Sequence, residues 1–300
     1  MNRLTILIPY YKISFFRETL LSLEQQTCKD FTLFIGDDYS PNNPLKLIQE
    51  ILKTTTYQYK KYTSNFGGKN LVKQWERVIN DANLTEWFMI LGDDDVISEN
   101  FVEQFYKNLS EINNNKCNVI KFSQCWIDEI GAHLNEFTKY HRLLDPSANL
   151  NLKLSHGHRS SLSEYIFKTN SYKRIGFKDF PLAWGTDDIA LLEFSEEKPI
   201  FFIHKAQVLV RMSSENISGK VDNKVEKLQA TSEHEKYLLK NHYHKLEKKY
   251  LKHLVDQHIY HSFHHKTPLG FSLLKVYLYL KEYKRILALP KTYYILNQKK

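Results

Sequence analysis

The chain has 300 residues, of which 42% are hydrophobic and 25% charged, and its formal net charge is +8. A chain of this length and composition can bury one large core, so one catalytic domain with a smaller tail is the simplest partition. No apolar run reaches the roughly 20 residues of a membrane span, and the amino-terminal run is too short for a secretory signal. A cytoplasmic location is therefore expected. The three cysteines lack metal-binding spacing, so buried free thiols are expected.

Three short apolar, β-rich runs, at residues 4–8, 31–35 and 87–91, predict buried strands. The first two are followed by segments at 15–26 and 45–52 in which apolar residues recur at helical spacing. Because strands and helices alternate at the spacing of βαβ units, we expect a parallel sheet with right-handed crossovers. This architecture is typical of nucleotide-binding proteins.

Acidic residues follow two of these strands. Asp37 and Asp38 come after Gly36, and residues 93–95, all Asp, come after Gly92. Ligands of open α/β sheets bind at the carboxyl ends of the strands, so both groups can converge on one ligand. Adjacent carboxylates repel one another and attract a hard divalent ion such as Mg²⁺ or Mn²⁺. An acidic surface turn is the alternative.

Five segments, in this order and spacing, resemble the signature of family 2 glycosyltransferases: residues 4–11, 22–27, 36–40, 65–68 and 93–95. The resemblance covers roughly residues 1–215. It implies the GT-A fold, an α/β architecture with a Rossmann-like, mixed but mainly parallel sheet flanked by helices. It also implies transfer of a sugar from a nucleotide-diphosphate sugar, with a UDP-sugar as the expected donor, and a divalent cation, Mn²⁺ or Mg²⁺.

The resemblance also implies roles for single residues. Asp94 matches the family's metal ligand, and Asp93 matches the residue near the donor ribose. Many members have an acid, a small residue and two acids where this chain has Gly92 and three Asp, so Asp94 and Asp95 both remain candidate metal ligands. Asp38 matches the acid that accepts a hydrogen bond from the nucleobase.

Two further parts of the nucleotide pocket are expected. Pro9 and Tyr11 match the residues beside the nucleotide. The loop at 65–70 offers flexible backbone and one ammonium group, so Asn65, Gly67 and Lys69 are candidate contacts to the donor, with Lys69 at the diphosphate. An ordinary turn is the alternative for this loop, and an Asx turn is the alternative for Asp38.

A candidate catalytic base lies far downstream. Residues 180–190 resemble the family segment in which an acidic pair opens a helix, and Asp187 matches the base, with Asp188 as the second candidate. A carboxylate at a helix amino terminus is stabilised in its ionised form, which suits general-base catalysis on a hydroxyl. The alternative is a capping residue. One base suffices for direct displacement, which inverts the anomeric configuration.

Residues expected to meet the acceptor lie nearby in the sequence. His158 and Arg159 are candidates for a phosphate or an acidic sugar, and Trp184 adjoins the predicted base. Arg211 and residues 213–219 resemble the mobile lid that closes over the donor in relatives. A plain surface loop is the alternative for the lid.

The positive charge is concentrated in the tail. Residues 220–300 contain 17 basic and 7 acidic residues, so we divide the chain into a catalytic domain at 1–219 and a basic helical extension at 220–300. Helices are expected at 225–254 and 271–289, with apolar residues on one face and Lys or Arg on the other. Such helices suit the cytoplasmic face of an anionic membrane, where lipid-linked acceptors are displayed. A packed bundle or a homodimer contact is the alternative.

The sequence thus predicts an inverting, metal-assisted glycosyltransferase that uses a glycan or lipid-linked acceptor in surface polysaccharide or glycolipid synthesis, without a nucleic-acid partner. Two other classes are the alternatives. A nucleotidyltransferase can share the sheet and the acids, but no Gly-rich phosphate loop follows the first strand. A nucleic-acid-binding protein is suggested only by the pI near 9.1 and the basic, Tyr-rich tail.

Overall fold

The structure is a computed structural model, which describes residues 2–157, 160–214, 224–265 and 272–298. The chain divides into two compact units. The sheet unit comprises Met1–Pro146, Arg159–Asp179 and Thr186–Lys220, and the helical unit comprises Ser147–His158, Phe180–Gly185 and Val221–Lys300. Short segments before residue 186 therefore belong to the helical unit, in addition to the carboxyl-terminal part of the chain.

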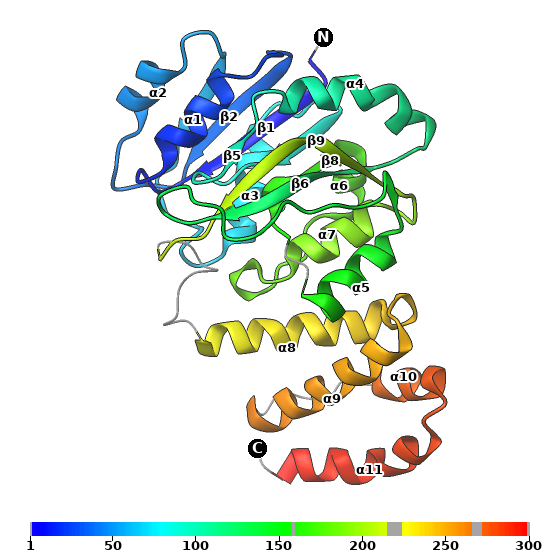
Figure 1. Cartoon of the computed structure of the whole chain (residues 1–300). Helices are drawn as coiled ribbons and strands as arrows, with labels where there is room; N and C mark the ends of the chain where they lie inside the picture. Colours follow the sequence, from blue (N-terminus) through cyan, green and yellow to red (C-terminus); the bar gives the residue numbers. More distant parts are fainter. Residues whose placement is uncertain (1, 158–159, 215–223, 266–271, 299–300) are drawn as a thin grey trace. The chain divides into compact units, whose positions relative to one another are not determined.

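The sheet unit is built on one mixed sheet, shown in Figure 1. Its strands run in the spatial order β3-β2-β1-β4-β8-β6-β9-β5, and β7 pairs with β9. Their bounds are β1 (Leu4–Tyr10), β2 (Phe31–Asp37), β3 (Tyr57–Lys61), β4 (Trp87–Ile90), β5 (Val96–Ile97), β6 (Val119–Ile127), β7 (Leu143–Leu144), β8 (Tyr165–Lys168) and β9 (Ile200–Arg211).

The first four strands pair in parallel with one another, as β6 and β9 also do. β1 pairs in parallel with both β2 and β4, and β2 pairs in parallel with β3. This register places the ends of β1, β2 and β4 at one edge, with Pro9 beside Gly36 and Leu7 beside Ile90. The predicted strands at 4–8, 31–35 and 87–91 and their parallel arrangement are confirmed, and the acids that follow β2 and β4 share this edge.

Helices cover the sheet because each presents one apolar face to it. In α3, Asn70 caps the amino terminus by accepting from the N–H of Lys73, and Val72, Trp75 and Val78 are buried. The helices of the sheet unit are α1 (Phe16–Glu24), α2 (Leu45–Ile51), α3 (Leu71–Asp81), α4 (Phe101–Asn114), α6 (Thr169–Ile175) and α7 (Thr186–Phe194), with a 3₁₀ turn at Leu162–Glu164. The helices predicted at 15–26 and 45–52 are α1 and α2.

The helical unit contains the predicted tail helices, but each is interrupted. The segment at 225–254 forms α8 (Lys224–Asn241), a 3₁₀ turn (Tyr243–Lys245) and α9 (Lys248–His265). Asn151 explains this break, since its side chain donates to the carbonyl of Lys245 and accepts from the N–H of Glu247. The segment at 271–289 forms α10 (Ser272–Leu280) and α11 (Tyr283–Gln298), because Lys281 adopts a φ of +61°.

The helical unit also contains α5 (Pro146–His156) from Ser147 onward and a 3₁₀ turn at Pro181–Ala183. Gly185 follows this turn with a φ of +79°, and a Cβ there would lie 2.6 Å from the ring of His234 on α8. Both the backbone and the space therefore require glycine. In the part of the chain that the structure describes, no helix combines the length and the apolar content needed to cross a membrane.

Candidate active site

The acid turn, residues 92–95, leaves β4 at the edge where the parallel strands end. All three Asp residues are buried, each less than 10% exposed. The N–H of Gly92 donates to Oγ of Ser163, and a Cβ on Gly92 would lie 2.7 Å from the Asp95 carboxylate. Glycine is thus needed for the turn to close tightly over its own side chains.

Asp93 holds the loop that follows β1. Its Oδ2 accepts the backbone N–H groups of Tyr11 and Lys12, both at 2.7 Å, and Thr19 of α1 donates to its carbonyl. Burial raises the pKa of Asp93 above its usual value, and the charge of Asp94 adds to this, against the opposing effect of Lys12. Asp93 thereby fixes Tyr11, a predicted nucleotide contact, at the strand edge.

Asp94 is paired with a cation from the same loop. The Nζ of Lys12 lies 2.6 Å from Oδ2 of Asp94 and 3.7 Å from Oδ1 of Asp93, and the Lys12 side chain is only 20% exposed. Burial alone would lower the pKa of Lys12, but the carboxylates of Asp93 and Asp94 raise it. Within the described residues, Oδ1 of Asp94 has no hydrogen-bond partner.

Asp95 faces the interior. Its Oδ2 accepts from Oγ of Ser163, and its Oδ1 accepts the N–H of Arg211 at 2.9 Å. Burial raises the pKa of Asp95, and the neighbouring Asp94 charge raises it further. Both oxygens of Asp95 are therefore engaged by the protein, whereas Asp94 keeps one oxygen available.

Arg211 corrects an expectation from the sequence. The prediction placed it among acceptor or lid residues, but it ends β9 and its side chain is fully buried. Its guanidinium donates to the carbonyls of Asp94, Asp128 and Glu129 and pairs with Glu18 of α1. These acceptors draw the side chain inward, so Arg211 clamps the acid turn. Most of the predicted lid, residues 215–219, lies outside the described residues.

The side chains of the acid turn determine whether it can hold a cation. The described residues contain no set of three or more His, Cys, Asp or Glu side chains arranged around one ion. Mg²⁺, however, is usually held by one or two carboxylates together with substrate phosphates. The buried carboxylates already attract one cation, the Lys12 ammonium, and Asp94 offers a free oxygen. The donor set therefore fits a hard divalent ion shared with a diphosphate, with Asp94 as the protein ligand.

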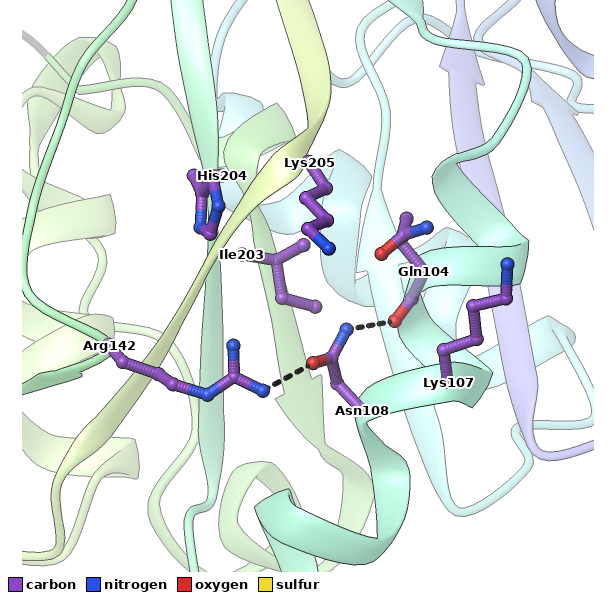
Figure 2. A pocket seen from close by; sticks show the side chains of 7 residues that line it. All are labelled: Gln104, Lys107, Asn108, Arg142, Ile203, His204 and Lys205. Carbon is purple, nitrogen blue, oxygen red and sulfur yellow. Dashed lines mark hydrogen bonds between the residues drawn. The ribbon is translucent and has the colours of Figure 1, made fainter.

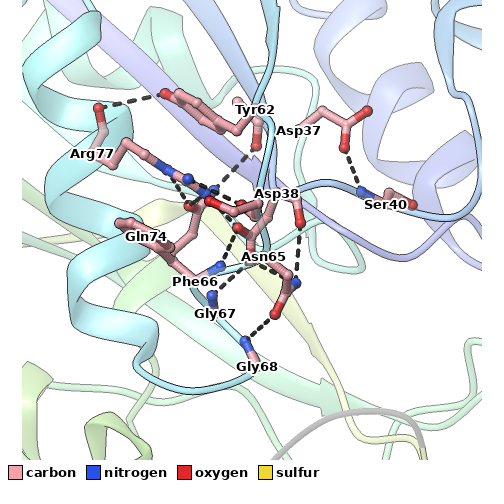
Figure 3. A network of polar contacts seen from close by, with 12 residues as sticks. Asp37, Asp38, Ser40, Tyr62, Asn65, Phe66, Gly67, Gly68, Gln74 and Arg77 are labelled. Carbon is pink, nitrogen blue, oxygen red and sulfur yellow. Dashed lines mark hydrogen bonds and ion pairs between the residues drawn. The ribbon is translucent and has the colours of Figure 1, made fainter.

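Asp38 anchors the loop at residues 65–68, as Figure 3 shows. Its Oδ1 accepts the N–H of Phe66 at 2.7 Å and pairs with Arg77, and its Oδ2 accepts from Gly67 and Asn65. An ionised carboxylate has about four lone-pair sites. The predicted hydrogen bond from a nucleobase would therefore have to replace one of these contacts.

Arg77 completes this network from α3. Its guanidinium lies 3.8 Å from the ring centre of Tyr62 and 4.1 Å from that of Phe66, and it also contacts Gln74. Burial raises the pKa of Asp38, although the N–H groups of the loop and Arg77 oppose this effect. The loop is thus held by a buried ion pair at the end of β2.

The remaining predicted nucleotide residues lie in or beside this loop. Gly67 approaches Asp38 so closely that a Cβ would lie 2.7 Å from its Oδ2, and Asn65 accepts the N–H of Gly68. Lys69 is exposed. Pro9 lies in β1 opposite Gly36, and the carbonyl of Tyr11 accepts from Ser40.

Asp187 and Asp188 lie in the first turn of α7. Oγ of Ser160 lies 3.2 Å from Oδ2 of Asp187 and 3.4 Å from Oδ1 of Asp188. Asp188 is buried, whereas Asp187 is partly exposed. Of the two, Asp187 is therefore the better placed to meet a substrate hydroxyl.

The segment at 160–163 connects this helix start to the acid turn. Ser160 contacts Asp187, and Ser163, three residues later, contacts Asp95. Three residues of chain span at most about 11 Å. Carboxylates separated by some 90 positions in the sequence thus belong to one region of the sheet unit.

Three of the predicted acceptor residues are not among the described residues of the sheet unit. Trp184 belongs to the helical unit, where the ammonium of Lys227 lies 5.5 Å from its ring centre. His158 and Arg159 lie outside the described residues.

A separate polar pocket of about 220 Å³ lies between α4 and β9 (Figure 2). Its lining contains Lys205 and Arg142, and the Arg142 guanidinium is already paired with Glu111 and Asn108. No residue predicted for the active site lines it.

Sequence reasoning missed several residues that organise the site. Lys12 was detectable, since loops that follow parallel strands face the ligand edge and this loop contains a cation. Arg77 gave no such signal, because its position on α3 shows only helical periodicity. Ser163 likewise gave none, since its contact with the acid turn is purely tertiary.

Comparisons with known proteins identify the family and the fold. A family model described as glycosyl transferase family 2 matches residues 5–170, more than half of the chain. Comparison with curated proteins gave no match. Among solved structures, residues 1–349 of S. aureus TarS in complex with UDP-GlcNAc match with a TM-score of 0.64 and 15% identity, covering 87% of this chain and 73% of that one.

Two further structures have the same fold. Residues 1–349 of S. aureus TarS match without a named ligand at a TM-score of 0.60 and 13% identity, covering 92% of this chain and 79% of that one. GalNAc-T7 with UDP, GalNAc and Mn²⁺ matches at 0.51 and 13% identity, covering 86% and 54%. The GT-A fold predicted from the sequence is confirmed, and the chain belongs to glycosyl transferase family 2 and is a glycosyltransferase.

Proposed function

We propose that the protein is an inverting transferase that moves a sugar from a UDP-sugar to a hydroxyl of a glycan or a lipid-linked acceptor. The observation that carries this proposal is the arrangement at the strand edge. The acid turn and the start of α7 are connected through residues 160–163, and the loop held by Asp38 follows the neighbouring strand.

Two comparisons support the donor class. TarS was solved with UDP-GlcNAc and GalNAc-T7 with UDP, and both have the fold of this chain. In our proposal the nucleotide lies along the β1 and β2 ends, against Pro9, Tyr11 and the loop containing Asn65 and Gly67. Asp93 keeps the Tyr11 backbone in place, and the ammonium of Lys69 reaches the diphosphate.

A divalent cation, Mn²⁺ or Mg²⁺, would be held by Asp94, and when bound it would neutralise charge on the departing diphosphate. The presence of Mn²⁺ in the GalNAc-T7 structure supports this choice. Asp95 supports the turn from behind through Ser163 and Arg211. In this arrangement Lys12 must leave the Asp94 carboxylate or share it.

Asp187 is the proposed base. It takes the proton of the acceptor hydroxyl while the acceptor oxygen bonds to the anomeric carbon and the bond from that carbon to the diphosphate oxygen breaks. A single displacement of this kind inverts the anomeric configuration. Ser160 orients the carboxylate, and Asp188 is the second candidate.

We further propose a role in surface polysaccharide or glycolipid synthesis, in the cytoplasm and on the inner face of the membrane. The domain boundary at residues 219 and 220 and a homodimer contact also stay predictions. A basic tail supports the membrane location, because it is attracted to anionic lipids.

The proposal is tested by donor binding and turnover. Thermal shifts are measured with UDP, GDP, UDP-GlcNAc and other UDP-sugars, with and without Mn²⁺, since a ligand that binds the folded state raises its stability. Release of UDP from the bound donor is then followed, and the anomeric configuration of the product is read by NMR. Absence of any nucleotide-dependent shift would overturn the donor assignment, and a product that retains the donor's configuration would overturn the inverting mechanism.

A further inference from the structure

Among the residues that the structure describes, none covers one face of each of the last two helices of the helical unit. α10 and α11 bury Leu273, Val276 and Leu289 on their inner sides. On the outer sides, apolar side chains are between 40% and 82% exposed: Leu274, Leu278, Tyr283, Leu287, Tyr294 and Ile295. Large apolar side chains gathered on one helix face indicate an interaction surface.

On α11 the exposed side chains form one stripe. Tyr283, Leu287, Lys291 and Tyr294 follow one another at spacings of four, four and three residues, which keeps them on one side of an α-helix. Leu287 is the most exposed of them, at 82%. The stripe runs along most of a 16-residue helix that contains Pro290, so it has two turns or more on either side of the proline with which to contact a surface.

The charged groups that α10 and α11 expose beside this stripe are ammonium groups, while Arg285 of α11 pairs with Asp256 of α9. Lys284 and Lys291 are exposed on α11, as are Lys275 on α10 and Lys281 between the helices. The only acidic residue at 272–298 is Glu282, which pairs with Lys252 of α9. The uncovered faces therefore combine apolar groups with ammonium groups and present no carboxylate.

This charge pattern disfavours a second copy of the chain as the occupant. In a two-fold dimer the same patch meets itself. The lysines of α11 would then face like charges, because residues 283–298 contain no acid to pair with them. An anionic lipid surface provides the missing negative charge, and its boundary region accommodates both Leu and Tyr side chains.

We propose that the face of α11 formed by Tyr283, Leu287 and Tyr294 with Lys284 and Lys291, together with the exposed face of α10, binds a membrane of anionic phospholipid. The helix lies in the interface without crossing it. The membrane location proposed above would thus depend on this surface and on anionic lipid. The inference rests on the proposed function only for the biological purpose of membrane binding, since binding to lipid needs neither donor nor acceptor.

Binding is measured by co-sedimentation of the full chain with vesicles of phosphatidylcholine alone or mixed with phosphatidylglycerol. The wild type is expected to bind the mixed vesicles and to bind less as salt rises. Leu287→Gln is expected to weaken binding about tenfold, because it removes one large apolar group from the interface. The double variant Lys284→Gln/Lys291→Gln is expected to lose about 20-fold or more, since each basic residue near an anionic surface contributes about fivefold.

Matched controls remove the same groups elsewhere. Ile130 is 90% exposed in the sheet unit, and Lys240 and Lys249 are exposed on or beside the other tail helices, so Ile130→Gln and Lys240→Gln/Lys249→Gln are expected to bind vesicles much as the wild type does. Circular dichroism verifies that every variant keeps its helices.

Three results would overturn the inference. The first is equal binding by the wild type and the α11 variants, and the second is equal binding to neutral and anionic vesicles. The third is a wild type that self-associates in light scattering and becomes monomeric with Leu287→Gln, without binding vesicles. A protein that binds anionic vesicles but never transfers a sugar would instead leave this inference standing and contradict the proposed function.

Discussion

The ion pair between Asp38 and Arg77 offers a sharp test of how the nucleotide site is built. Asp38→Ala deletes the acceptor of two loop N–H groups and leaves the guanidinium of Arg77 without its carboxylate. Removing one partner of a fully buried pair costs about 3–5 kcal/mol. Because the Arg77 side chain is 16% exposed and keeps its contacts to Gln74 and Tyr62, we expect the lower end, about 3 kcal/mol.

Comparing Asp38→Ala with Arg77→Met distinguishes a direct role of Asp38 in nucleotide binding from an indirect one. If Asp38 acts through the loop, Arg77→Met should weaken UDP binding by a factor similar to that of Asp38→Ala. The control is Lys73→Met, which removes an exposed cation from the same helix and should change neither stability nor affinity. Stability is measured by urea unfolding followed by tryptophan fluorescence, and affinity by calorimetry.

A double-mutant cycle completes the test. The pair should show a coupling of about 1–3 kcal/mol, as expected for residues in one buried network. A coupling near zero would refute the proposal that Asp38 and Arg77 hold the loop together. Loss of UDP affinity in Asp38→Ala but not in Arg77→Met would instead mean that Asp38 meets the base directly.

Three further outcomes are expected. In calorimetry UDP should bind more tightly with Mn²⁺ than without it, and Asp94→Ala should abolish this difference. Lys12→Met should strengthen Mn²⁺ binding, because it removes the competing ammonium. Equal affinities of the wild type with and without metal would exclude the metal site. Asp187→Asn should lower turnover by about 10²-fold or more at unchanged donor affinity, and near-normal turnover would make Asp187 structural and shift attention to Asp188. Burial lowers the pKa of His258 to about 4, so protonation of this side chain stabilises the unfolded state relative to the folded one. The free energy of unfolding should therefore fall by about 3 kcal/mol between pH 6.5 and pH 4. His258→Leu should reduce this pH dependence, and the same pH dependence in variant and wild type would contradict the assignment.

Much of the catalytic edge was predictable because its signals are local. A short apolar run, a glycine and two or three acids mark the ends of β2 and β4 without reference to the rest of the chain. The strand β6 was not predicted, since its buried residues include Lys121, Ser123 and Gln124. Lys121 is tolerated there because it lies near Glu164 and over the ring of Tyr140, partners that only the tertiary structure brings together.

The roles within the site divide in the same way. That Asp94 is better placed than Asp95 to hold a cation depends on Ser163 and Arg211, which occupy the Asp95 oxygens. Arg211 itself resembled a lid residue because it is followed by a polar loop. The Arg211 side chain is buried because it donates to three backbone carbonyls that are distant in sequence, and no local sequence pattern predicts these contacts.

The clamp formed by Arg211 has a consequence for how the enzyme is made. Arg211 contacts Asp95 of the acid turn, which precedes it by 116 positions, and Glu18, which precedes it by 193 positions. At about 5–20 residues per second, a ribosome needs roughly 6–23 s to reach Arg211 after it has completed the turn. During that interval the three carboxylates emerge without the guanidinium that arranges their backbone. We therefore expect strands β1 to β4 to form early and the acid turn to reach its final geometry only when β9 joins the sheet. Nascent chains that end before Arg211 would then be partly folded but unable to bind a donor tightly.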